Sequence, residues 1–203
     1  MRITSEEHAL HALLWPTLRP VLREYPEINV EFSTDYALTD IVAERFDAGV
    51  RRGAIVAKDM IAVPIGAPMR AVTVASPAYL AERQLPKTPD DLAGHSCINF
   101  RLPTSGRLPT WDYRKGAREL QVRVQGQLVF NSVSSILEAS LDGFGLAYLQ
   151  NSLVQPFLDS GELREVLADW SLPFPGYHLY YPNRRQPTAA FNMVVEALRY
   201  RGR

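Results

Sequence analysis

The hydrophobic residues of this chain switch repeatedly between two spacings, and this switching limits the folds that it can adopt. Apolar residues between Leu10 and Tyr25 recur every three or four positions, which predicts an amphipathic helix packed on a core. Pro16 and Pro20 should kink or divide this helix, because each removes a backbone donor. Residues 28–32 then alternate apolar and polar side chains, which predicts a half-buried strand. Helices that alternate with strands favour an α/β fold with mainly parallel sheets.

The same patterns predict the rest of the elements. Ser76 and Pro77 are expected to cap and begin a short helix, and Asn131 and Ser132 should cap another that stops at Gly143. A polar alternating pair, residues 119–124 and 127–130, predicts a hairpin that turns at residues 125–126. The remaining expectations are helices over residues 38–45, 152–158 and 189–200 and strands over residues 46–50, 61–65, 71–75, 97–100, 111–114, 146–149 and 177–181.

The middle of the chain reads as a unit inserted between two outer parts. Proline and glycine become frequent over residues 86–116, and the strands expected there are short. We therefore expect one subdomain from residues 1–75 plus 177–203 and a second from residues 76–176, with the chain crossing between them twice.

Composition and charge exclude several classes of protein. With 46% hydrophobic and 22% charged residues, the chain has the composition of a globular protein. Lys and Arg number 22 and so do Asp and Glu, so the basic excess that usually accompanies duplex binding is missing. Cys97 is the only cysteine, which excludes an intrachain disulfide. The first residues lack the apolar core of a signal peptide, and no apolar run is long enough to span a membrane, so we expect a cytoplasmic protein.

Several segments, in order along almost the whole chain, resemble one family, the effector-binding (substrate-binding) domain of LysR-type transcriptional regulators. The family pattern is most specific in residues 40–51, DIVAERFDAGVR, and in residues 74–80, VASPAYL. Each motif alone is weak, and their order gives the resemblance its strength. Further similar segments are LWPTL at residues 14–18, PDDLAGHSCI at 89–98, DGFGLA at 142–147 and PGYHLYYP at 175–182.

The resemblance implies a periplasmic-binding-protein-like (type 2) fold, in which two Rossmann-like α/β subdomains are joined by two crossover strands. A small-molecule effector would bind between the subdomains, and the protein would act as a homodimer or tetramer. Family members begin with a winged helix-turn-helix that binds DNA. Because Met1 stands immediately before the first expected strand, we expect this DNA-binding domain to be absent from the chain. Gln150 departs from the family pattern, which often has proline there.

The ends of expected strands and the starts of expected helices supply the candidate ligand-binding residues. Helix N-termini carry free amides and partial positive charge, which favour an anionic or polar ligand. On the family fold, the helix starts near Ser5 and His8 and near Asn131, Ser132 and Val133 face the ligand. Capping alone would also explain the two serines, and the acidic residues at positions 6 and 7 would complement the first terminus by themselves.

Three more candidates follow strands rather than begin helices. Thr34 ends the second expected strand and is a candidate to line the site from the first subdomain. Phe100 and Arg101 follow a strand of the second subdomain. Phe100 is a candidate for an aromatic wall of the site, and Arg101 is a candidate to donate two parallel hydrogen bonds to a carboxylate or phosphate. A role for Arg101 as an ordinary surface arginine stays open.

No motif in the chain points to catalysis, a cofactor or a metal. His8 and His11 at helical spacing, and His95 near Cys97, do not complete a recognised zinc-ligand set. The nucleophile elbow, the P-loop and the complete dinucleotide-binding fingerprint are all missing. We therefore predict a sensor domain that is not an enzyme. A solute-binding protein of a transporter is the alternative, and an enzyme on the same architecture is a third reading, since a fold does not determine a function.

Overall fold

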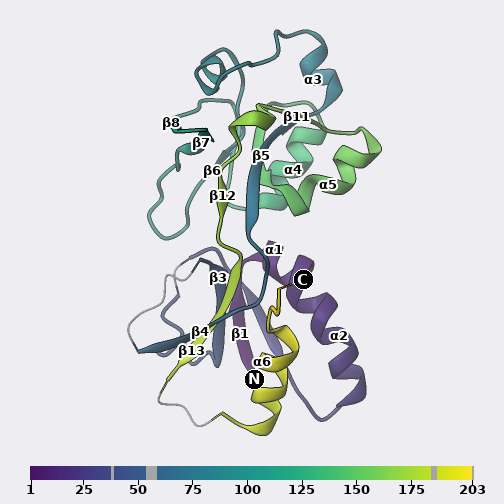
Figure 1. Ribbon diagram of the computed structural model, residues 1–203, viewed down its shortest axis with the longest axis vertical. Helices are drawn as coiled ribbons and strands as arrows, with labels where there is room; N and C mark the ends of the chain where they lie inside the picture. Colours follow the sequence, from purple (N-terminus) through teal and green to yellow (C-terminus); the bar gives the residue numbers. More distant parts are fainter. Residues whose placement is uncertain (38, 54–58, 184–186, 203) are drawn as a thin grey trace. The chain divides into compact units, whose positions relative to one another are not determined.

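The computed structural model describes residues 1–37, 39–53, 59–183 and 187–202, and the chain divides into two compact units (Figure 1). The first unit comprises Met1–Pro68 and Pro175–Arg203, and the second comprises Met69–Phe174. The predicted divisions lie later in the chain, between residues 75 and 76 and between residues 176 and 177. The difference arises because the strand β5 (Met69–Ala75) pairs with strands of the second unit along its length. It therefore belongs to that unit from its first residue.

The first unit is built on a mixed sheet of five strands. The strand β1 lies parallel to β2 on one side and to β3 on the other, while β13 runs antiparallel to both β3 and β4. Because β1, β2 and β3 point the same way, their carboxyl ends meet at one edge of the sheet. In sheet order the strands are β2 (Glu31–Thr34), β1 (Arg2–Ser5), β3 (Ala48–Arg52), β13 (Tyr177–Pro182) and β4 (Met60–Pro64).

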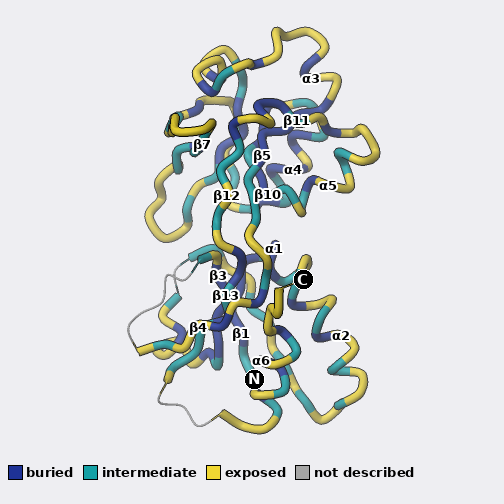
Figure 2. The backbone as a smooth tube through the Cα atoms, viewed as in Figure 1, coloured by how far each residue is buried: buried dark blue, intermediate teal, exposed yellow. Residues whose placement is uncertain are grey.

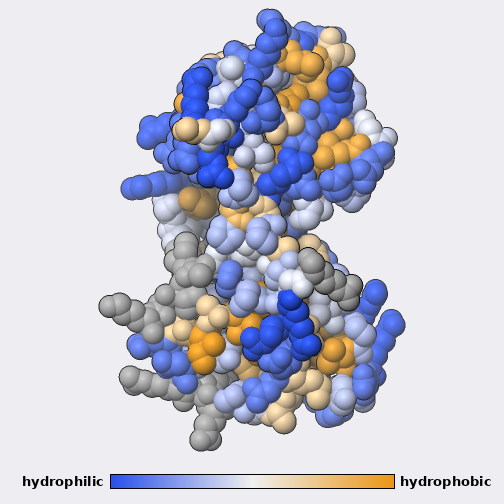
Figure 3. Space-filling view, in the orientation of Figure 1, coloured by the Kyte–Doolittle hydropathy of each residue, from blue (hydrophilic) through white to orange (hydrophobic). Residues whose placement is uncertain are grey.

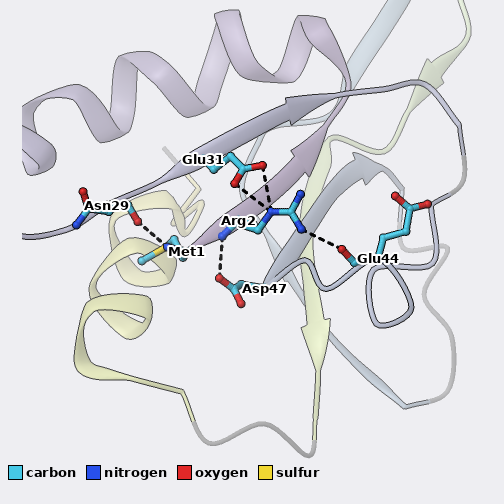
Figure 4. Close-up of polar contacts among 6 residues, drawn as sticks. All are labelled: Met1, Arg2, Asn29, Glu31, Glu44 and Asp47. Carbon is cyan, nitrogen blue, oxygen red and sulfur yellow. Dashed lines mark hydrogen bonds and ion pairs between the residues drawn. The ribbon is translucent and has the colours of Figure 1, made fainter.

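The register with β1 places β2 later than predicted. The pattern predicted a strand over residues 28–32, whereas β2 begins at Glu31, opposite Arg2. Figure 4 shows how Arg2 holds this end of the sheet together. Its Nε lies 3.0 Å from a carboxylate oxygen of Glu31, its backbone N–H donates to Asp47 at 2.7 Å, and its guanidinium donates to the carbonyl of Glu44 at 3.0 Å.

The first long helical segment begins at Glu7, within the predicted start near Ser5 to His8, and its hydrogen-bonding pattern changes before its prolines. It consists of α1 (Glu7–Ala9), a π-helical stretch over Leu10–Leu14, and α2 (Trp15–Glu24). Pro16 stands in the first turn of α2, where its missing N–H is tolerated, and Pro20 lies inside the helix. The helix therefore continues through both prolines, and its hydrogen-bonding pattern changes just before the first of them.

The helix predicted over residues 38–45 is wrong: residues 41–45 form a turn, and residue 38 lies outside the described residues. The Asp40 carboxylate accepts hydrogen bonds from the backbone N–H groups of Val42 and Ala43, at 3.0 and 3.1 Å, as a capping residue does. Arg45 then adopts a left-handed conformation with φ of 57°, and the N–H of Phe46 bonds to the carbonyl of Ile41 at 2.8 Å. The helix-like start therefore closes after one turn.

Apolar side chains from the sheet and from two helices fill the core of the first unit. The helix α6 (Ala189–Leu198) is capped by Thr188, whose hydroxyl accepts from the N–H of Phe191, and it packs against α2. In Figure 2 the buried residues of each unit gather along its strands. Fully buried side chains in the first unit include Ile3, Leu14, Leu18, Val50, Leu179 and Val194.

The second unit is organised around β5, and most of its strand pairs are antiparallel rather than parallel as predicted. All strands that pair with β5 run antiparallel to it. These strands are β10 (Ala147–Gln150), β11 (Arg164–Val166) and β12 (Pro173–Phe174). A parallel pair, β6 (Asn99–Phe100) and β9 (Val129–Phe130), lies beside β10, since Cys97 forms a parallel bridge with Leu146.

The predicted hairpin over residues 119–130 is also wrong, because its two strands choose other partners. β8 (Arg118–Val122) turns back on β7 (Trp111–Lys115) at Gly116, which has φ of 59°. β9 instead pairs with β6. Residues 125–126 do not form the hairpin turn and instead lie beside Cys97, whose N–H donates to the carbonyl of Gln125 at 2.8 Å. The alternation of polar and apolar residues predicted strands here, but it does not specify which strand pairs with which.

The helices of the second unit begin as the sequence predicts. The Ser76 and Ser132 hydroxyls each accept a hydrogen bond from the backbone three residues later, so both caps are confirmed. These helices are α3 (Pro77–Ala81), α4 (Val133–Leu141) and α5 (Asn151–Ser160). The core beside them is rich in aromatic side chains: Tyr148 stacks on Trp111 with ring centroids 5.3 Å apart, and the hydroxyls of Tyr113 and Thr73 lie 2.7 Å apart.

Replacing Gly126 with alanine should destabilise the second unit. A Cβ atom at this position would lie 2.1 Å from the carbonyl oxygen of Cys97, and the backbone must shift to make room. We expect a loss of about 1–3 kcal/mol in the free energy of unfolding, the range for overpacked sites, measured by urea denaturation. Gly94→Ala is the matched control, because a Cβ there meets nothing within 4 Å. Equal stabilities of the two variants would contradict the prediction.

Candidate functional site

The carboxyl edge of the parallel strands in the first unit brings together two of the predicted site residues. Ser5 ends β1 directly opposite Thr34, which ends β2. Ser5 is completely buried, and its hydroxyl has no hydrogen-bond partner among the described residues, whereas Thr34 is exposed. The structure therefore places one concealed and one accessible hydroxyl side by side at this edge.

His8 belongs to a buried polar network that the sequence analysis did not foresee. The Tyr177 hydroxyl donates to the Glu6 carboxylate at 3.3 Å, and since it has only one hydrogen, His8 Nδ1 donates to its oxygen at 3.0 Å. Arg52 completes the chain through an ion pair of 3.2 Å with Glu6. His8, Glu6 and Tyr177 are each at most 6% exposed, so these three members are buried, whereas Arg52 is exposed. Burial raises the pKa of Tyr177 strongly and keeps its hydroxyl protonated.

The acidic residues at the start of the first helix bind other side chains rather than capping the helix. The Glu6 side chain makes no capping bond to the helix, because its carboxylate is directed to Arg52 and Tyr177. Glu7 lies in the first turn and accepts a hydrogen bond from Tyr36 at 3.4 Å. Both acidic residues near the helix start therefore have partners within the protein.

A second arginine, Arg51, is buried at the same edge and was also missed. Its guanidinium donates to the carbonyls of Val50 and Ala37, at 2.8 and 2.9 Å, and to the hydroxyl of Thr4 at 3.4 Å. Its Nε has no partner among the described residues. The only sequence signal was its position at the end of a strand, in an arginine pair.

The remaining predicted site residues lie together in the second unit. Phe100 and Phe130 are opposite each other at the ends of β6 and β9, and the N–H of Arg101 donates to the carbonyl of Phe130 at 2.7 Å. Asn131, Ser132 and Val133, which begin α4, follow directly. Asn131 and Arg101 are exposed and Val133 is buried. One guanidinium nitrogen of Arg101 donates to the carbonyl of Gly106 at 2.7 Å.

The features of the described residues outside these two edges concern metal binding, membrane spans and a surface hollow. Among them, no group of three or more His, Cys, Asp or Glu side chains is arranged to hold a metal ion. None of the helices in the described ranges is long and apolar enough to cross a membrane. A polar hollow of about 500 Å³ lies beside α3, lined by Arg83, Lys87, His95 and their neighbours, and it contains none of the predicted site residues.

With this geometry in view, the relationship to known proteins is clear. The family model described as the LysR substrate binding domain matches residues 1–203, and the chain belongs to this family. A protein of Pseudomonas aeruginosa named as a transcriptional regulator is 52% identical over 200 residues, which cover 98% of this chain and 65% of that protein. The HTH-type transcriptional regulator PgrR of Escherichia coli is 44% identical over 202 residues, which cover 100% of this chain and 68% of PgrR. The chain thus spans about two thirds of these relatives.

Solved structures confirm the predicted fold class. The regulatory domain of CrgA from Neisseria meningitidis, a LysR-type transcriptional regulator, aligns with a TM-score of 0.82 at 23% identity and covers 98% of both chains. The regulatory domain of AphB from Vibrio vulnificus aligns with a TM-score of 0.84 at 21% identity, covering 98% of this chain and 96% of that domain. The periplasmic-binding-protein-like fold is therefore established, and nothing in these likenesses supports the transporter alternative.

The buried imidazole of His8 should make stability fall as the solution becomes acidic. Desolvation lowers its pKa below 6.5, outweighing the nearby Glu6 carboxylate, while Arg52 and His11 lower it further. The folded state therefore binds fewer protons than the unfolded state, so the contribution is complete above pH 6.5 and is lost as the pH falls below it, by up to about 1.4 kcal/mol per pH unit.

Urea denaturation between pH 7.5 and about 5 measures this slope. We expect His8→Gln to flatten it relative to the wild-type chain, while His11→Gln, at an exposed position, retains it. If all three proteins lose stability with the same slope, protonation of His8 is not coupled to unfolding.

Proposed function

We propose that this chain is the effector-sensing part of a LysR-type transcription regulator. The observation that carries the proposal is the match of the LysR substrate binding domain to the whole chain, supported by relatives that are named as transcriptional regulators. The zero formal charge agrees with a role in sensing rather than in direct contact with DNA. In this proposal, DNA is bound through an N-terminal winged helix-turn-helix, and the protein works in the cytoplasm without acting as an enzyme.

Each unit offers a polar edge for contact with a small-molecule effector. In the first unit this edge carries the exposed Thr34 and, opposite it, the buried Ser5, and His8 belongs to the buried network nearby in the chain. In the second it carries Phe100, Arg101 and the start of α4 at residues 131–133. Both edges lie at the carboxyl ends of parallel strands, where α/β folds bind their ligands. That one effector touches both edges stays a prediction.

Signalling in such a sensor requires differential binding. An effector shifts the regulator toward the conformation that it binds more tightly, and the shift cannot exceed that difference in affinity. Oligomers transmit the change to DNA, and we expect a homodimer or a tetramer. Trp15, at the start of α2, has 46% of its surface exposed and is a candidate contact in such an assembly. Figure 3 shows apolar side chains among the hydrophilic ones on the visible face of each unit.

A ligand screen tests the proposal directly. Compounds from a metabolite library should raise the melting temperature of the 203-residue chain, because a ligand that binds the folded state stabilises it by RT ln(1 + [L]/Kd). The same compound should change the affinity of the full-length regulator for its operator. A compound that binds tightly and leaves operator affinity unchanged would contradict the sensing role.

Arg101→Ala should weaken binding of an anionic effector found in this screen. Loss of charge-assisted hydrogen bonds costs about 1.5–3 kcal/mol, which corresponds to more than about ten-fold in Kd. Arg164→Ala, at an exposed position on β11, is the matched control and should bind like the wild-type chain. Isothermal titration calorimetry measures both. Unchanged affinity of Arg101→Ala would remove this arginine from the site.

A further inference from the structure

The edge of the second unit that carries Arg101 also holds two residues that the sequence analysis did not propose as ligand contacts. β6 runs parallel to β9, and the parallel bridge between Cys97 and Leu146 extends this order to the segment that leads into β10. Both segments run in the same direction from this bridge, and Arg101 and Gln150 each follow it by four residues. Gln150 ends β10 and Asn151 begins α5, so both follow the carboxyl end of a strand that runs in the same direction as β6, and α4 and α5 both pack against β10.

Gln150 carries a buried amide whose oxygen is unsatisfied. The residue is 4% exposed, and its Oε1 accepts no hydrogen bond from any described residue. It occupies the position before α5 without capping that helix through its side chain. The adjacent Asn151 repeats the pattern: its Oδ1 is buried without a partner, while its Nδ2 donates to Gln155 at 3.3 Å. Two acceptors without donors are costly to bury, and an N–H group of a bound molecule would satisfy them.

The same edge attracts negative charge. α4 and α5 have nine and ten residues, and neither has an acidic residue in its first turn. Their free backbone N–H groups and dipoles favour an anion, and no carboxylate of their own compensates them. The exposed guanidinium of Arg101 adds a formal positive charge beside them. Acceptors and positive charge together describe a ligand that has N–H donors and an anionic group.

We propose that Gln150 and Asn151 form a subsite for the N–H groups of the effector, beside an anion subsite made by Arg101 and the starts of α4 and α5. The effector is then an amino acid or a short peptide, in which an ammonium or amide group lies next to a carboxylate. This inference rests on the proposed function, since it assigns the chemistry of the effector edge in the second unit.

Pairs of probes that differ only in the amino group test the assignment. Each protein amino acid and a set of dipeptides are compared with their deaminated acids, such as L-glutamate with glutarate, by thermal shift and then by calorimetry at millimolar concentrations. We expect at least one amino compound to bind about ten-fold or more tightly than its deaminated partner, which corresponds to about 1.4 kcal/mol. Gln150→Met keeps the length of the side chain and removes the acceptor, so this preference should disappear while affinity for the deaminated acid persists.

Two further variants complete the design. Gln121→Met makes the same exchange at an exposed position on β8 and should keep the preference. Asn151→Ala, at a half-buried position, should weaken the preference and provides a second readout if Gln150→Met does not fold. Equal binding of both members of every pair, or a preference that survives both site variants, would overturn the subsite. Failure of all these probes would overturn the ligand class, while a different compound found in the wider screen would leave the proposed function standing.

Discussion

Parallel pairing of short strands is the constraint on which both candidate edges depend. In the first unit β1 bonds to β2 and β3, and the pairing with β2 brings Ser5 opposite Thr34, although 28 residues lie between them in the chain (residues 6 to 33). In the second unit β6 pairs with β9, and Arg101 therefore meets the start of α4. Parallel strands cannot be joined by tight turns, so these residues come from distant segments and meet only when the sheet forms.

Polar side chains are buried in both units, and their hydrogen-bonding partners differ between the two. The network of Arg52, Glu6, Tyr177 and His8 joins the carboxyl edge of the sheet to the start of the first helix. Charged groups can be buried when they are paired and hydrogen-bonded, and each member of this network satisfies another. Gln150 and Asn151 in the second unit differ, because their amide oxygens have no such partners among the described residues. The first arrangement is typical of structural support, and the second is the kind that a ligand can complete.

Local sequence patterns predicted the helices and their caps better than they predicted strand partners. Ser76 and Ser132 cap the expected helices, since capping depends on a few neighbouring residues. Within the helix expected at residues 38–45, residues 41–45 form a turn, and Arg45 ends it in a left-handed conformation that no propensity indicated. The hairpin expected at residues 119–130 is divided between two partners, because alternation shows that a segment can be a strand and does not specify its neighbour.

The sequence by itself determined the α/β class, the family and most of the residues at the two edges, because ordered motifs and strand ends are local features. Only the tertiary structure decided that β5 belongs wholly to the second unit, that Arg51 and Glu6 are buried, and that the segments leading to Arg101 and Gln150 run in the same direction. These properties depend on which strands pair and in which register. Main-chain hydrogen bonding between distant segments sets that register, and no single stretch of sequence encodes it.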